Sequence, residues 1–96
     1  MAEIDQEKIS VVHKYFEDEF PECNIRVGYD YDRMAPKFQV FCQAENYCTI
    51  INREFFYNRN TEEINDWLQT SELSKALADP TNRTIIINPE GEVTNG

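Results

Sequence analysis

The chain has 96 residues, with 18 acidic and 9 basic side chains and a net charge of −9. This length allows one domain with one modest core. The acidity excludes the concentrated basic patch that phosphate contacts need, so we expect no direct binding to nucleic acid and none to an anionic membrane surface. Aromatic residues form 12% of the chain, which predicts that aromatic side chains supply much of the buried area.

Targeting signals and cysteines indicate the compartment. The first residues are acidic, no apolar stretch of a secretory signal follows them, and no run is long enough for a transmembrane helix. The three cysteines, Cys23, Cys42 and Cys48, are an odd number without C-x-x-C spacing. We therefore expect a cytoplasmic protein with reduced thiols.

Residues 5–20 predict an amphipathic helix. Asp5 is a suitable N-cap because its carboxylate can accept from the free amides of the first turn. Pro21 ends the segment, since the residue before a proline is driven out of the helical region. Apolar side chains recur with the helical period on one face, at Ile9, Val12, Phe16 and Phe20.

Three strands are predicted next. Residues 23–31 alternate strictly between apolar and polar, as a half-buried strand does. Residues 37–43 and 47–57 follow, joined by a short hairpin loop at 44–46. The adjacent aromatic residues at 55–57 break the alternation and indicate a bulge or a strand end buried on both sides.

A loop of three residues sets a register for this hairpin. In that register Cys42 faces Cys48 and Val40 faces Ile50. The two cysteines are then interpreted as small buried hydrophobic residues or, as the alternative, a redox pair. The opposite face, away from the helices, then holds Phe41, Tyr47, Thr49 and Ile51.

The remaining segments contain one helix and one strand. Thr61 or Asn60 caps the helix, and the apolar spacing slips at Thr70-Ser71, which predicts a kink or two short helices. Residues 84–88 form a β-branched run typical of a strand. Residues 89–96 are polar and predict a flexible C-terminal tail.

These elements give the order α-β-β-β-α-β. The simplest packing is an α+β fold with an antiparallel sheet of three to four strands and two helices on one face. We expect residues 1–88 to form this single domain.

The sequence contains no recognisable catalytic or metal-binding pattern. One histidine and three scattered cysteines lack the close spacing of zinc sites, and the acidic runs lack the calcium-loop pattern. The three glycines form no phosphate-binding loop. We therefore expect no enzymatic activity, no cofactor and no metal.

Two surfaces are candidates for partner binding. Acidic residues gather where the first helix ends and oppose the helix dipole there, so they could dock a basic protein partner or remain merely solvated. The outward side chains of the hairpin could form a partner site or a homodimer interface, unless the register differs by one residue and they belong to the core. The candidate residues are Glu17, Asp18, Glu19, Glu22, Phe41, Tyr47 and Ile51.

The leading functional hypothesis is a non-enzymatic protein-interaction module: a small acidic adaptor, a chaperone-like protein or an inhibitor. One alternative is an acidic mimic of nucleic acid that inhibits a DNA-binding enzyme. Another is a small-ligand-binding domain with a cleft between the sheet and the second helix, near Trp67.

Overall fold

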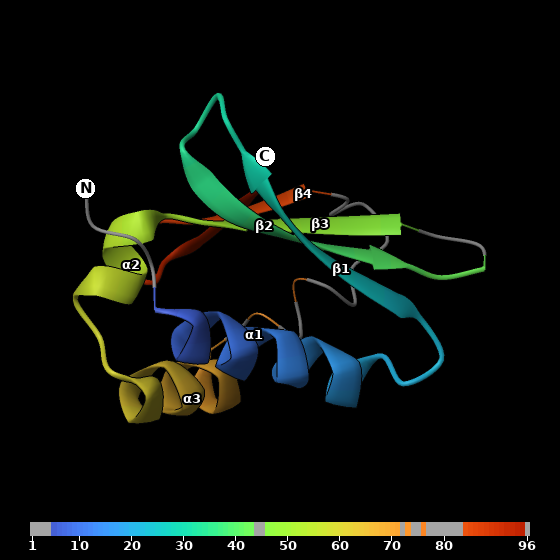
Figure 1. The fold of residues 1–96 in the computed structure, drawn as a ribbon, viewed down its shortest axis with the longest axis horizontal. Helices are drawn as coiled ribbons and strands as arrows, with labels where there is room; N and C mark the ends of the chain where they lie inside the picture. The colour runs from blue at the N-terminus through green and yellow to red at the C-terminus, as the bar shows by residue number, and fades with distance from the viewer. Residues whose placement is uncertain (1–4, 44–45, 72, 74–75, 77–83, 96) are drawn as a thin grey trace.

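The structure, a computed structural model, describes residues 5–43, 46–71, 73, 76 and 84–95. In chain order its elements are α1 (Gln6–Glu19), β1 (Asn24–Asp30), β2 (Ala35–Phe41), β3 (Asn46–Ile51), α2 (Arg53–Tyr57), α3 (Thr61–Thr70), β4 (Thr84–Ile87) and β5 (Val93–Asn95). The strands form one five-stranded sheet in the order β1-β2-β3-β4-β5. The helices α1 and α3 lie side by side under one face of this sheet (Figure 1).

The predicted α+β class is confirmed, whereas the predicted strand and helix numbers are only roughly right. The sheet is mixed, because β3 and β4 run parallel while the other neighbours are antiparallel. Three helices are described instead of two. The differences arise after β3 and at the C-terminal end of the chain.

Helix α1 begins and ends as the sequence predicts. The Asp5 side chain accepts a hydrogen bond from the Glu7 amide at 2.9 Å, which satisfies one of the free donors of the first turn. Val12 and Phe16 on the apolar side are completely buried. The Phe16 ring stacks on that of Phe38 in β2, with centroids 5.7 Å apart, so α1 is joined to the middle of the sheet.

The β1–β2 hairpin keeps the predicted alternation of β1. Its register runs from Asn24 opposite Phe41 to Asp30 opposite Ala35. Asp30 organises the turn, because its carboxylate accepts from the amides of Asp32 and Arg33. The hydrogen bond from the Arg33 amide, together with the Arg33 guanidinium, lowers the pKa of Asp30 below its usual value.

The β2–β3 register differs from the prediction by three residues. Val40 pairs with Tyr47 and Phe38 with Thr49, whereas the sequence placed Val40 opposite Ile50. Side chains alternate between faces, so a shift by an odd number moves the whole of β3 over. As a result, Thr49 and Ile51 face the helices and are fully buried.

The predicted strand through residue 57 is wrong in its second half. Asn52 caps α2 by accepting from the Glu54 amide at 2.9 Å. Phe55 and Phe56 are adjacent, and both are completely buried. A strand would point one of them away from the helix layer, whereas a helical turn brings both into the core.

The end of α3 and the C-terminal segment complete the fold. Asn60 and Glu63 form a capping box at the start of α3, and Ser71 leaves the helix in an extended conformation. α3 therefore ends where the sequence predicted a kink or two short helices. Beyond it the Leu73 amide donates to the Ser71 hydroxyl oxygen at 3.4 Å, and Leu73 and Ala76 are helical, which agrees with the second alternative. Residues 93–95 pair with β4 as strand β5, where the sequence predicted a polar tail. Three residues are too few to show the alternation of a strand in the sequence, and the segment forms a strand because it pairs with β4.

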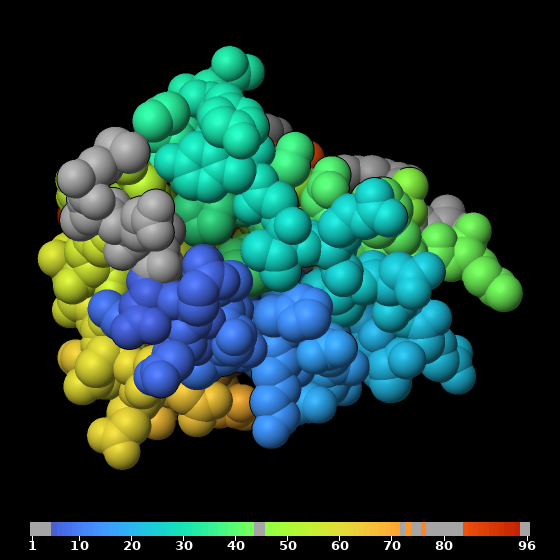
Figure 2. Space-filling view, in the orientation of Figure 1, coloured from blue at the N-terminus to red at the C-terminus, as the bar shows by residue number. Residues whose placement is uncertain are grey.

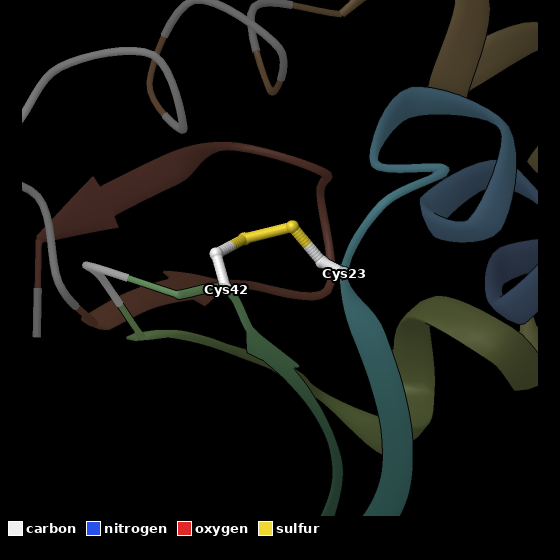
Figure 3. Close-up of a disulfide and its surroundings, with 2 residues drawn as sticks. All are labelled: Cys23 and Cys42. Atoms are coloured by element: carbon white, nitrogen blue, oxygen red, sulfur yellow. A yellow bond between two sulfur atoms is a disulfide. The ribbon is translucent and has the colours of Figure 1, made fainter.

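A disulfide joins Cys23 and Cys42, which flank the paired part of the β1–β2 hairpin (Figure 3). Their Cα atoms are 4.6 Å apart, and both residues pack against the core. This corrects the expected pairing of Cys42 with Cys48 and the expectation that all thiols are reduced. Cys48 is the free cysteine and lies on the other face of the sheet.

Replacing Thr49 by valine tests the register. Its hydroxyl oxygen is buried and has no hydrogen-bond partner among the described residues. Thr49→Val removes this unsatisfied group at nearly constant shape and should raise the free energy of unfolding by about 1 kcal/mol. Urea unfolding measures the change. A neutral or destabilising result would favour the outward position of the predicted register.

Loss of the disulfide should destabilise the chain. The bond closes a loop of 19 residues in sequence separation, so Cys23→Ala/Cys42→Ala should lower the free energy of unfolding by about 3 kcal/mol. Cys48→Ala is the control and should leave the bond intact. Labelling of the folded, unreduced chain with iodoacetamide should modify one cysteine; modification of all three would contradict this pairing.

Candidate functional site

The sheet has one face without a helix over it among the described elements, and we call this the helix-free face (Figure 1). Cross-strand pairing places four apolar side chains on it, Phe41, Cys48, Ile50 and Ile86, which we call the apolar path: Ile50 pairs directly with Ile86, and Phe41 is a diagonal neighbour of Cys48. Two basic side chains from β1 and β2 lie on the same face. The helix-free face is defined by Arg26, Lys37, Gln39, Phe41, Cys48, Ile50 and Ile86.

The apolar path on this face runs from one strand to the next. Ile50 pairs with Lys37 on one side and Ile86 on the other, and it is largely buried between them. Phe41 and Ile86 are half-buried. Half-buried apolar groups on a face without a helix layer are available for burial by a partner.

Arg26 and Lys37 supply the cations of this face, and the same register places the Asp30 carboxylate at its edge. The Arg26 guanidinium lies over the Phe41 ring, with its carbon 5.8 Å from the ring centroid, which is a cation–π geometry. Lys37 crosses the sheet toward β1, because its side chain fills the space above Gly28. Neither cation forms an ion pair within the described part of the chain.

The free thiol of Cys48 lies in the middle of the helix-free face. Burial raises the pKa of Cys48 above its ordinary value, and the nearby Lys37 partly offsets the increase by favouring the thiolate. A thiol of this kind reacts slowly at neutral pH. Its environment is therefore that of a structural cysteine and not of an activated nucleophile.

The structure divides the predicted hairpin residues between the two faces. Phe41 lies on the helix-free face, as predicted. Ile51 is completely buried in the core, and Tyr47 stacks on Phe20 of the α1 end with centroids 6.0 Å apart. Ile50 and Ile86 were not among the predicted site residues. The predicted β2–β3 register turned Ile50 toward the helices, whereas the observed register places it on the helix-free face beside Ile86.

The acidic residues at the end of α1 are exposed, as a docking surface requires. They are Glu17, Asp18 and Glu19 in the last turn, and Glu22 beyond it. No basic residue stands in that last turn. His13, one turn earlier, lies 3.5 Å from the Glu17 carboxylate. The C-terminal end of α1 and the N-terminal end of α3 lie at opposite ends of the helix layer, so their acids do not merge (Figure 1).

Trp67, near which the sequence predicted a cleft for a small ligand, contacts two other parts of the chain. The Trp67 ring packs edge-on against Phe55, with centroids 4.9 Å apart. Its indole N–H donates to the carbonyl oxygen of Gly91 at 3.0 Å. The C-terminal segment therefore occupies this side of α3, and Trp67 has a structural role.

Across the described residues, no group of three or more His, Cys, Asp or Glu side chains is placed to hold a metal ion. None of the described helices is long and apolar enough to cross a bilayer.

Comparison with known proteins adds no relative: no family model, no curated protein and no solved structure matches this chain. The function must therefore be argued from the residues themselves.

The reactivity of Cys48 should follow its surroundings. We expect its alkylation to be slower than that of a free thiol at pH 7 and to accelerate as the pH rises, because the raised pKa of Cys48 limits the thiolate. Lys37→Gln should slow the reaction further by removing the cation that favours the thiolate. The rate of reaction with iodoacetamide between pH 7 and 9 measures this.

Arg33→Gln is the matched control for the Lys37 variant, because Arg33 has a smaller influence on the same thiol. A Lys37→Gln rate equal to that of the parent chain would show that Lys37 does not act on Cys48.

Proposed function

We propose that this chain is a non-enzymatic protein-interaction module, an adaptor, chaperone-like protein or inhibitor, which contacts its partner through the helix-free face. The observation that carries the proposal is the apolar path of Phe41, Cys48, Ile50 and Ile86, framed by Arg26 and Lys37. A central apolar area with a charged rim is the usual anatomy of a protein interface.

The chemistry of this face favours binding over catalysis. Its thiol has a raised pKa, and the one carboxylate that the β1–β2 register adds to this face, Asp30, is held by the amides and guanidinium of its own turn. A general acid or base needs a titratable group held at a working pKa within reach of a substrate. Aromatic and arginine side chains, in contrast, are the residues that most often dominate binding energy.

Arg26 and Phe41 act as one unit in the proposal. The ring supports the guanidinium at 5.8 Å, which reduces the conformational freedom that the long side chain would lose on binding. A partner that covers both groups buries the apolar ring and receives a positioned cation.

The acidic end of α1 is a second surface in the same proposal, suited to a basic partner. Its four exposed carboxylates lie on the helix side of the molecule, whereas the apolar path lies on the opposite face. Variants can therefore separate the two surfaces.

Affinity purification from the native host, with quantitative mass spectrometry, tests the proposal. Phe41→Ser/Ile86→Thr removes apolar contacts and should weaken partner capture at least tenfold, since loss of an interface anchor costs about 1–2 kcal/mol. The comparison variant is Glu17→Lys/Asp18→Lys/Glu22→Lys, which leaves the helix-free face unchanged.

Both variants must retain the circular dichroism spectrum of the parent chain. Selective loss in the acidic-end variant would move the partner site to α1. Capture of the same proteins at the same level by both variants would refute the interaction proposal.

A further inference from the structure

Strand β1 is an edge of the sheet, and among the described strands it pairs on one side only. It is seven residues long, and every one of them pairs with β2 in an unbroken register. The opposite edge, β5, has only three residues. In Figure 1, β1 passes in front of the other strands, and its side chains form a band on the surface seen in Figure 2.

This edge has only part of the usual protection against pairing with another strand. Natural edge strands are shielded by prolines, by charged side chains and lysine above all, by bulges or by a covering segment. β1 contains neither proline nor lysine, its charged side chains are Arg26 and Asp30, and its continuous register with β2 excludes a bulge. Val27, in the middle of the strand, is 41% exposed. An apolar side chain therefore marks the centre of an open backbone edge.

The sequence of β1 is complementary to itself in the antiparallel direction. A two-fold axis at Val27 places Val27 opposite its own copy and Ile25 opposite Tyr29. A two-fold axis at Gly28 places Val27 opposite Tyr29 instead. In both registers the apolar row of β1 continues into that of the second copy, on the helix side of the sheet.

The charges on the other side of β1 agree with the same pairing. With the axis at Gly28, Arg26 stands directly opposite Asp30 of the second copy; with the axis at Val27, the two are diagonal neighbours. Opposite charges in these positions stabilise paired strands, whereas like charges directly opposite destabilise them. Neither register sets Arg26 directly opposite its own copy.

We propose that β1 pairs antiparallel with β1 of a second copy of this chain, so that the two five-stranded sheets become one continuous sheet. The contact is isologous, because the same strand serves on both sides and closes the assembly at two chains. It leaves the helix-free face open on both copies. The proposal therefore goes beyond the proposed function and does not depend on it.

The interface is one strand wide, which predicts a weak dimer. Interfaces much smaller than about 1,200 Å² are typical of transient contacts. We expect monomers at low micromolar concentration and dimers at about 0.1–1 mM. Sedimentation equilibrium of the full chain over this range measures the association.

Val27→Lys is the deciding variant. It introduces at the centre of the edge the residue that natural edges use against pairing, and it should reduce the dimer at least tenfold. Val27→Thr is the matched control, because it keeps a β-branched side chain and adds no charge. Val27 is at the surface, and urea unfolding verifies that each variant folds.

Cross-linking identifies the register. In a Cys48→Ser background, Val27→Cys should give a disulfide-linked dimer under mild oxidation if the axis lies at Val27, and Gly28→Cys if it lies at Gly28. A chain that remains monomeric at 1 mM overturns the proposal. A dimer that Val27→Lys leaves intact, including one broken by Phe41→Ser/Ile86→Thr, also overturns it and assigns the contact to another surface.

Discussion

The burial of two adjacent phenylalanines determines how the chain continues after the first three strands. Phe55 and Phe56 are both completely buried, which a strand under a single helix layer does not permit. The chain therefore leaves the sheet and forms α2. Side chains donate to the carbonyl groups at the end of this short helix: the ammonium of Lys8, distant in sequence, donates to the Phe56 oxygen at 2.7 Å, and Arg59, four residues after Phe55, donates to the Phe55 oxygen at 3.3 Å. The carbonyl groups of the last turn are thus satisfied, and the Lys8 contact joins α2 to α1.

The C-terminal half of the fold follows from this turn. Because α2 and α3 carry the chain away from β3, it returns as β4 in the parallel direction. Arg59 lies over the Phe55 ring and also donates to the Pro89 oxygen at 2.9 Å. Trp67 holds the same segment through the Gly91 carbonyl, at a glycine whose φ of +84° suits a residue without a side chain. These contacts bring residues 93–95 to the edge of the sheet as β5.

Local signals predicted most of the elements, and non-local pairing explains what they missed. The Asp5 cap, the alternation of β1 and the Asn60 cap depend on neighbours in sequence, so they could be read directly. The β2–β3 register could not, because β3 carries apolar residues on both faces and offers similar burial in either phase. The candidate site inherited this error: Phe41 was placed correctly, whereas Ile50 and Ile51 exchanged faces. The disulfide was missed because it also depends on non-local pairing: the register of β1 with β2 brings Cys42 next to Cys23.

The net charge of −9 describes the chain but not each of its surfaces. Three acids stand in the last turn of α1 and three more on α3, on the helix side of the sheet, whereas Arg26 and Lys37 face the opposite way. At physiological ionic strength, exposed charges are screened beyond about 8 Å. A partner at the helix-free face therefore meets the nearby cations and the apolar path more strongly than the acids of the helix layer. The acidic composition of the whole chain argues against nucleic acid as a partner. The helix-free face, where cations stand beside apolar side chains, suits a protein surface that has carboxylates around an apolar centre.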